Sequence, residues 1–122
     1  MPSHDPQMLK GVLTVLLLQL LANVDSYGYG IVSQLREAGF TDVAEGTVYP
    51  ALTRLEQSGA LESYLLRSNS GPARKYYRTT SAGRAELETR MRSWSDLVDS
   101  VNNVIDTTAP APNPPAHREA SL

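Results

Sequence analysis

The chain has 122 residues, the usual length of a single domain, and its 41% hydrophobic and 20% charged residues are typical of folded proteins. It has no cysteine, and its two histidines, His4 and His117, lie near opposite ends. The usual zinc ligand sets and the Cys/His and Ser/His/Asp catalytic groups therefore cannot form from the interior of the chain. The composition predicts a protein that is not an enzyme and needs no metal and no cofactor.

The first predicted helix covers about residues 8–23 and is apolar on nearly all sides, so we expect a partner subunit to cover part of it. Its apolar stretch is shorter than the roughly 20 residues of a membrane span. Asp5 precedes it and no small-residue cleavage site follows, which argues against a signal peptide. We expect residues 1–7 to be flexible and the protein to be cytoplasmic, with no membrane contact.

The second predicted helix covers about residues 27–38 and the third about residues 47–58, and a glycine stops each of them. Gly46 and Thr47 are the expected caps of the third helix, which tolerates Pro50 because that residue falls in or near its first turn. The residues at helical spacing that we expect to face the core are Ile31, Val32 and Leu35 on the second helix and Val48, Leu52 and Leu55 on the third.

Two β-rich runs follow, residues 61–67 and 74–80, and a Ser/Asn/Gly/Pro linker at 68–73 indicates a hairpin between them. The order helix, helix, helix, hairpin is that of a winged helix-turn-helix domain over residues 8–80. The formal net charge is −2, but residues 64–84 contain basic residues and no acidic one. Such a stretch indicates an anion-binding face, and DNA phosphate is the common partner for one, whereas the plain alternative is a solvated hairpin face.

The last predicted helix is long, at residues 81–106, and its apolar residues are spaced three and four apart. This spacing is that of a coiled-coil seam, which predicts a homodimer. The fold class is therefore mainly α with a small β-hairpin, a winged helix-turn-helix domain plus a long C-terminal dimerisation helix. Residues 107–122 are rich in proline and are expected to form a disordered tail. The predicted dimer interface consists of Leu87, Met91, Trp94, Val98, Val101 and Ile105.

Short motifs follow one another along the chain: Leu9-Lys10-Gly11, Tyr27-Gly28-Tyr29, Glu45-Gly46-Thr47-Val48-Tyr49-Pro50-Ala51-Leu52, Arg54-Leu55-Glu56, Gly71-Pro72-Ala73-Arg74-Lys75-Tyr76-Tyr77, and Thr80 with Gly83-Arg84. In these motifs, over about residues 8–106, the chain resembles the PadR-like transcriptional regulators. The resemblance implies a cytoplasmic bacterial repressor that binds a palindromic operator as a homodimer through its long C-terminal helix. Gly30 stands where the family usually has Glu, and Thr79 where it usually has Leu.

In a helix-turn-helix protein the third helix enters the major groove of double-stranded DNA. The outward residues expected there are Thr47, Tyr49, Pro50, Thr53 and Arg54. The alternatives are that Tyr49 packs locally and that Arg54 pairs with a carboxylate of its own domain.

The hairpin wing is expected to lie along the DNA backbone, with Arg74 at its tip in the minor groove and Lys75 on a phosphate. Tyr76 and Tyr77 alternate faces, so one belongs to the core and the other, for which we choose Tyr76, lies near the backbone. At the start of the second helix, Tyr27 and Gly28 can present a hydroxyl and a backbone N–H to phosphate, although a tyrosine there is also a common structural residue.

Trp94 is the sole tryptophan and lies on the predicted seam, where a symmetric dimer brings it close to its own copy. Some short PadR-like proteins stack planar aromatic drugs between such tryptophans, and the resemblance makes an aromatic effector a hypothesis here. The alternative is that Trp94 is plain core. The residues expected to line the site with it are Leu13, Val15, Leu17, Met91, Asp96 and Val98.

The leading prediction is thus a ligand-responsive, DNA-binding repressor. A winged-helix protein-protein interaction module without DNA binding is the alternative, and the acidic pI of about 5.6 permits it. The uninterrupted basic stretch favours DNA. An enzyme would need a paired acid and base in a pocket, and no such spacing is present.

Overall fold

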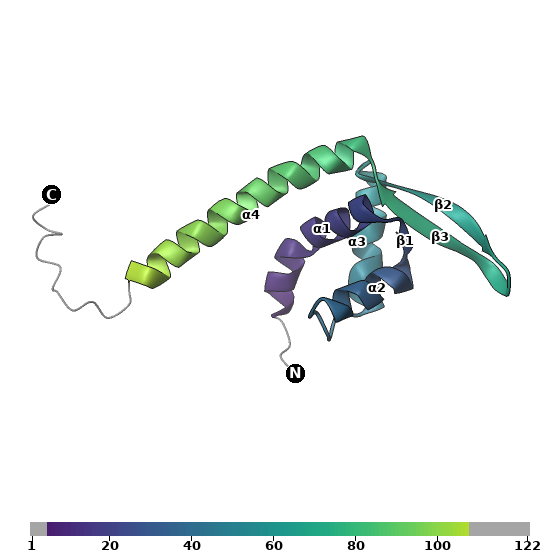
Figure 1. Cartoon of the computed structure of the whole chain (residues 1–122), viewed down its shortest axis with the longest axis horizontal. Helices are drawn as coiled ribbons and strands as arrows, with labels where there is room; N and C mark the ends of the chain where they lie inside the picture. The colour runs from purple at the N-terminus through teal and green to yellow at the C-terminus, as the bar shows by residue number, and fades with distance from the viewer. Residues whose placement is uncertain (1–4, 108–122) are drawn as a thin grey trace, which may run out of the picture. The chain divides into compact units, whose positions relative to one another are not determined.

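The computed structural model describes residues 5–107 and confirms the predicted fold class, a mainly helical chain with a small antiparallel sheet (Figure 1). The chain divides into two compact units between Arg90 and Met91. The elements in chain order are α1 Pro6–Asn23, β1 Ser26–Tyr27, α2 Gly28–Glu37, α3 Glu45–Gln57, β2 Leu61–Ser68, β3 Gly71–Thr79 and α4 Ser81–Thr107.

The helix α1 begins at Pro6, two residues earlier than predicted, so residues 6 and 7 are helical rather than part of a flexible N-terminus. The reason is a cap that the sequence pattern did not reveal: the Asp5 carboxylate accepts a 2.8 Å hydrogen bond from the Gln7 backbone N–H, and proline suits the first helical position. The α1 residues that lie buried in the core are Leu13, Thr14, Leu17, Leu18 and Leu21.

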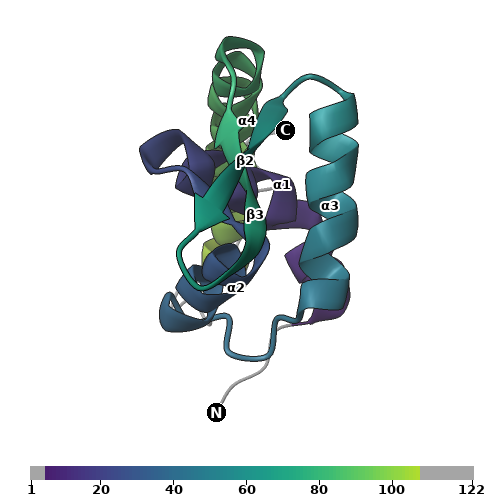
Figure 2. The same ribbon diagram turned by 90° about the vertical axis from the view of Figure 1, so that its right-hand side faces the viewer.

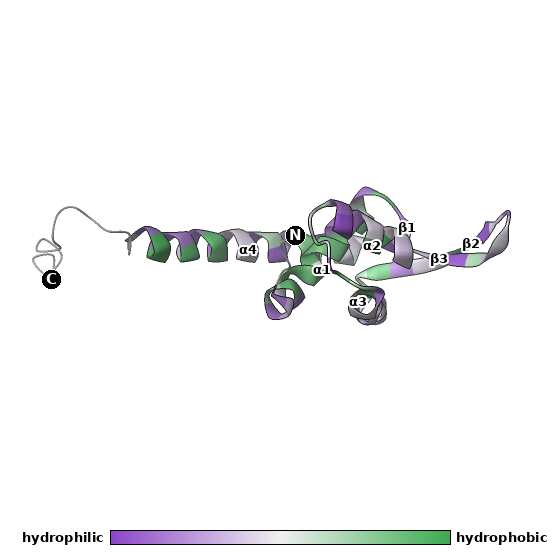
Figure 3. Cartoon of the chain, turned by 90° about the horizontal axis from the view of Figure 1, so that it is seen from below, coloured by the Kyte–Doolittle hydropathy of each residue, from purple (hydrophilic) through white to green (hydrophobic). Residues whose placement is uncertain are grey.

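By length and composition alone α1 is apolar enough to cross a membrane, with 18 residues and a mean hydropathy of 1.2, contrary to the expectation that the stretch is too short. Its apolar residues instead form part of the hydrophobic core of the domain. Leu17 and Leu18 are fully buried, and Leu16 and Leu20 are partly buried against the same core. Figure 3 shows much of α1 in the green of hydrophobic residues. We therefore interpret α1 as the central helix of the domain core.

The two following helices bury the predicted stripes, and Gly39 and Gly59 stop them with φ angles of +120° and +89°, which favour glycine. The start of α3 differs from the prediction. The helix begins at Glu45 after Ala44, which provides no side-chain cap, so neither Gly46 nor Thr47 caps it. Pro50 consequently lies inside the helix rather than in its first turn.

The sheet has the antiparallel order β1-β3-β2, and Figure 2 shows its strands β2 and β3 side by side. The predicted linker 68–73 is too long, because β3 already begins at Gly71 and the turn consists of Asn69 and Ser70. The strand accommodates Pro72 next to an irregularity in register between Leu66 and Ser68, the kind of place where a sheet admits a proline. The two-residue strand β1 was not predicted.

Two contacts connect the start of α4 to the rest of the domain, and a third caps the helix. The Thr80 backbone N–H donates to the Ala60 carbonyl oxygen at 3.0 Å, and the Thr80 hydroxyl accepts from the Gly83 backbone N–H at 3.0 Å, which caps the helix. The Arg84 guanidinium donates to the Ala22 carbonyl oxygen at 3.1 Å, so a cation meets the C-terminal end of α1, where the helix dipole favours positive charge.

The apolar residues of α4 divide into two groups. Leu87 is buried in the core of its own chain, at 7% exposure. The prediction that it belongs to a dimer interface is therefore wrong. The exposed group includes Leu97 and Val104, which the predicted seam omitted. The helix also includes Thr107, which was expected in the tail, and residues 108–122 lie outside the described part of the chain. The seam residues after Leu87 are Met91, Trp94, Val101 and Ile105, which are exposed, and Val98, which is partly buried.

Candidate nucleic-acid interface

The outward face of α3 is exposed as predicted. Arg54 forms no ion pair with any residue in the described part of the chain, so the alternative of a carboxylate partner in its own domain is not supported. The exposed side of α3 could be predicted from helical geometry, because Val48, Leu52 and Leu55 are buried and fix which side of the helix faces outward. The residues on this exposed face are Thr47, Tyr49, Pro50, Thr53 and Arg54.

Tyr49 combines exposure with local packing. Its side chain is 41% exposed, but its ring lies directly against Gly28, where an added Cβ would overlap the ring. Burial, followed by the nearby Glu45 carboxylate, raises the pKa of the Tyr49 phenol above its usual value of 10.0. The phenol is therefore a neutral hydroxyl at physiological pH, which can donate a hydrogen bond.

A cleft of 250 Å³ lies where α2, α3 and β3 meet. Gly28 is the first residue of α2, so the positive end of the helix dipole is at this cleft. Arg74 and Lys75 add two cationic side chains, both exposed. The cleft is thus a small, electropositive hollow with hydroxyl groups in its wall, which suits an anion. The lining residues are Tyr27, Gly28, Tyr49, Arg74, Lys75 and Tyr77.

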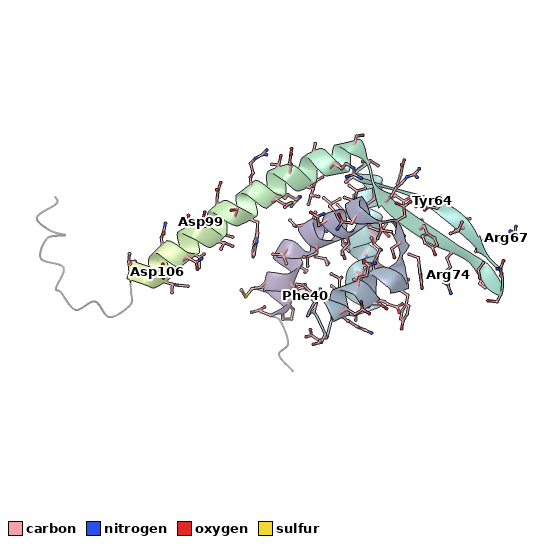
Figure 4. The ribbon with its side chains drawn as sticks, in the orientation of Figure 1. Phe40, Tyr64, Arg67, Arg74, Asp99 and Asp106 are labelled. Atoms are coloured by element: carbon pink, nitrogen blue, oxygen red, sulfur yellow. The ribbon has the colours of Figure 1, made fainter. Side chains whose placement is uncertain are left out.

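Arg74 does not lie at the tip of the wing as predicted, because it pairs with Leu66 within the β2–β3 ladder (Figure 4). Its guanidinium carbon lies 4.7 Å from the centroid of the Tyr27 ring, which is cation–π geometry. The Tyr27 ring in turn lies 5.4 Å from that of Tyr76, whose centroid is 5.9 Å from that of Tyr64. The aromatic row thus holds Arg74 beside the start of α2.

The pairing of β1 with β3 creates this arrangement, because it places Tyr27 opposite Tyr76. Tyr76 is partly buried and Tyr77 is buried at 5% exposure, which confirms that one of the pair belongs to the core. Tyr27 has a structural role, because its ring supports the guanidinium of Arg74. It also lines the cleft.

Lys75 has a partner within the domain. Its ammonium nitrogen lies 3.1 Å from Oε1 of Glu56 on α3, and Oε2 of Glu56 accepts a hydrogen bond from the Ser63 hydroxyl. These contacts lower the pKa of Glu56 below its usual value of 4.5, and the hydrogen bond from Ser63 has the largest effect. The bond to Glu56 raises the pKa of Lys75, so both groups are charged at neutral pH.

The remaining cations of the hairpin differ in their partners. The Arg78 guanidinium donates to Glu62 at 2.6 Å and lies 4.0 Å from Asp25, which also accepts a 2.6 Å hydrogen bond from the Tyr64 hydroxyl. Arg67, close to the wing tip (Figure 4), has no ion-pair partner among the described residues. Arg67 was not among the predicted site residues, although its place just before the turn was a usable signal.

The residues predicted to line an effector site are not all on the surface. Leu13 and Leu17 are buried in the core of their own chain, so their side chains are not exposed to line such a site. Val15 is partly buried against the same core, and Trp94 is 47% exposed. Met91 and Asp96 are exposed, and Val98 is partly buried. Among residues 5–107 no cluster of His, Cys, Asp or Glu has the arrangement of a metal site.

Comparison with known proteins places this architecture in a family. The family model described as "Transcriptional regulator PadR-like family" matches residues 17–89. A transcriptional regulator of Mycobacterium tuberculosis is 38% identical over 85 residues, which are 70% of this chain and 78% of that protein. The crystal structure of a PadR-like transcriptional regulator from Bacillus cereus superposes with a TM-score of 0.74 at 40% identity, covering 81% of this chain and 96% of the other. A PadR family regulator from Eggerthella lenta gives a TM-score of 0.77 at 34% identity, covering 84% and 88%. The chain belongs to the PadR-like family of transcriptional regulators.

Proposed function

We propose that this regulator binds a palindromic operator in double-stranded DNA as a homodimer and represses transcription in the cytoplasm. The observation that carries the proposal is the electropositive cleft at the junction of α2, α3 and β3, which lies beside the exposed face of α3. A single DNA backbone can thus bind in the cleft while α3 occupies the neighbouring major groove.

A backbone phosphate fits the cleft for three reasons. The first N–H groups of α2, which begins at Gly28, have no partner within the helix and point toward its N-terminal side. Arg74 and Lys75 neutralise negative charge. The Tyr49 phenol stays protonated and can donate a hydrogen bond. In this pose the cleft fixes the register of α3 on the duplex, and the side chains of α3 read the bases.

The wing contributes a second contact. Arg67 lies two residues before the turn and has no ion-pair partner among the described residues, whereas Arg74 lies further back on the same hairpin. In the proposed complex Arg67 reaches the minor groove and Arg74 the phosphate beside the cleft. This assignment replaces the expectation that Arg74 is the wing-tip residue.

The homodimer is proposed from the exposed apolar residues of α4 after Arg90. Burying each large apolar side chain contributes roughly 1.5 to 3 kcal/mol, so several of them from each chain exceed an association cost of about 4 to 15 kcal/mol. Two-fold symmetry then presents two α3 helices to half-sites about one DNA turn apart. The residues that a second copy would cover are Met91, Trp94, Leu97, Val101, Val104 and Ile105.

A planar aromatic effector is part of the same proposal. In a symmetric dimer the half-exposed Trp94 lies near its own copy, and Met91, three residues earlier on the same helix face, is exposed as a flexible lining group. Asp96 is also exposed and supplies a negative charge nearby in the chain. Such a ligand releases DNA only if it binds one spacing of the two α3 helices better than another, a coupling of typically 1 to 3 kcal/mol. Quenching of Trp94 emission by a panel of aromatic cations tests this point.

The first experiment is a titration of the protein against labelled duplexes from the region beside its own gene, with salt and nonspecific competitor, followed by selection of bound fragments from the whole genome. We expect competitor-resistant binding with a steep salt slope. The double variant Arg74→Ala/Lys75→Ala should lower the affinity and flatten the slope. The matched control Arg78→Ala/Arg90→Ala removes two cations that do not line the cleft and that pair with Glu62 and Glu86.

The second candidate function is a winged-helix interaction module that does not bind DNA. The net charge of −2 and the 72% exposure of Leu65 on the wing favour it. Failure to enrich any genomic fragment, together with equal salt slopes for the two double variants, would support this function and reject the operator.

A further inference from the structure

Glu56 connects the exposed helix α3 to both strands of the wing. It lies in the last turn of α3, and its side chain uses both carboxylate oxygens. Oε2 accepts the hydroxyl of Ser63 on β2, and Oε1 lies 3.1 Å from the ammonium nitrogen of Lys75 on β3. One residue of the helix therefore contacts each strand of the hairpin by a separate polar bond.

The register of the hairpin makes this double contact possible. Ser63 pairs with Tyr77, and Leu65 pairs with Lys75, so Ser63 and Lys75 belong to neighbouring pairs on one face of the two strands. That face is the one turned toward α3, since Tyr77 on it is buried in the core. Figure 2 shows α3 alongside the hairpin.

These bonds contribute little to holding the domain folded. The side chains of Lys75 and Glu56 are 50% and 32% exposed, and ion pairs of such exposure add little to stability. The helix and the hairpin already share a core through Leu55 and Leu61, which are 4% and 2% exposed. The bonds instead connect Lys75 and Ser63, one on each strand of the hairpin, to the last turn of α3.

We propose that Glu56 is a positioning residue, which fixes Lys75 and the wing against α3 and thereby sets how well this surface discriminates its operator from other DNA. The proposal rests on the proposed function. Operator binding requires α3 and the wing to contact one duplex at the same time, whereas nonspecific binding needs only cations near phosphates. Loosening the wing therefore weakens operator binding and leaves nonspecific binding intact.

The test compares Glu56→Gln with Glu62→Gln by fluorescence anisotropy, on a selected operator and on a random duplex of equal length. Glutamine keeps an acceptor for Ser63 and removes the charge that holds Lys75. The control removes the same charge from β2, but the partner of Glu62 is Arg78 within the hairpin, so it does not connect the wing to α3. Ser63→Ala breaks the other bond without changing the charge.

We expect Glu56→Gln to lower the ratio of operator to random affinity by about three- to tenfold relative to the control, as for the loss of one typical hydrogen bond. The salt slope on the operator should fall by about 1, because Lys75 no longer meets its phosphate. Ser63→Ala should lower the same ratio by a smaller factor. Thermal melts identify any variant that is unfolded, and Ser63→Ala then carries the test.

Each outcome has a distinct meaning. If the wild-type protein discriminates and Glu56→Gln and Ser63→Ala discriminate equally well, Glu56 does not position the wing and the proposal is wrong. If Glu56→Gln and Glu62→Gln raise affinity for both duplexes by the same factor, Glu56 acts only through its charge, which also overturns it. If the wild-type protein does not discriminate at all, the proposed function fails, and this proposal fails with it.

Discussion

The hydroxyl group of Thr79 donates a 2.8 Å hydrogen bond to the backbone carbonyl oxygen of Leu18, 61 residues earlier in the chain. Thr79 is the last residue of β3 and is 6% exposed, so this bond joins the wing to the central helix inside the core. The bond explains how a hydroxyl group is tolerated at this buried position.

Replacement of Thr79 by valine keeps the shape of the side chain and removes its hydroxyl. We expect the free energy of unfolding to fall by about 1 kcal/mol, the net contribution of a typical hydrogen bond. Urea denaturation measures the change. Thr89→Val on the exposed surface of α4 is the control and should remain within about 0.5 kcal/mol of the wild type. Equal midpoints for the two variants would contradict the role of the bond.

Gly83 and Gly11 are both helical but should respond oppositely to alanine. A Cβ at Gly83 would overlap the Ala60 carbonyl oxygen and lie 2.7 Å from Cγ2 of Thr79, whereas one at Gly11 has no neighbour within 4 Å. We expect Gly83→Ala to destabilise the protein by about 3 kcal/mol through overpacking, and Gly11→Ala to stabilise it by up to about 1 kcal/mol through helix propensity. Thermal melts of both variants measure the two changes. Destabilisation by Gly11→Ala would contradict the open space around a Cβ at that position.

Gly28→Ala should separate DNA binding from stability. The added Cβ would meet the hydroxyl end of the Tyr49 ring, which can swing away on its side chain, so the cost in folding is small. The displaced phenol leaves the cleft, and we expect operator affinity to fall by about tenfold, equivalent to one lost hydrogen bond to a charged group. The double variant Gly28→Ala/Tyr49→Ala should bind no worse than Tyr49→Ala alone. Additive losses would show that the two residues act independently.

Substitutions at Leu87 and Val101 test whether the buried and the exposed apolar residues of α4 have different roles. Leu87 is buried in its own domain, so Leu87→Ala should cost about 2 to 5 kcal/mol of stability. Val101 is 46% exposed in the single chain, and Val101→Asp should give a folded monomer because a carboxylate is buried only at a large cost. Sedimentation velocity with circular dichroism measures both properties. A Val101→Asp protein that still sediments as a dimer would rule out the proposed interface.

The pH dependence of stability should reveal the Glu56 contacts. Because the pKa of Glu56 is lowered in the folded state, its contribution to stability is present above its usual pKa of 4.5 and is lost as the pH falls through the lowered value. Glu56→Gln has no such group. Because the contacts are partly exposed, we expect the difference in free energy of unfolding between wild type and variant to be small at pH 7 and to shrink further toward pH 3, measured in urea. A difference that stays constant over this range would contradict the lowered pKa.

The sequence predicted α2 and α3 well because each has a buried stripe at helical spacing, as in Ile31, Val32 and Leu35. It placed the start of α3 too late because Ala44 precedes that helix without a capping side chain. It shortened β3 because Pro72 indicated a linker, and only the irregular register of the hairpin admits a proline there.

The site was predictable to the extent that it depends on one helix face. The exposed side of α3 follows from periodicity, and the basic residues of the hairpin follow from composition. The cleft does not, since Gly28, Tyr49 and Lys75 meet only when three elements have folded together. The bond between Glu56 and Lys75 likewise depends on hairpin register, which spacing along the chain does not reveal. The roles of Leu13 and Leu17 were misassigned because an all-round apolar helix does not show which side faces its own core.

Trp94 is the sole tryptophan of the chain and is not part of the buried core. The six tyrosines all lie before Arg90, and one of them, Tyr77, belongs to that core. The two chromophores therefore report on different events. Emission from the indole follows what happens along α4 after Arg90, such as association of chains or arrival of a quenching molecule, while near-ultraviolet tyrosine signals follow the winged domain. One unlabelled sample thus provides two optical signals, and a change in indole emission indicates a change around Trp94, in the part of the chain after Arg90.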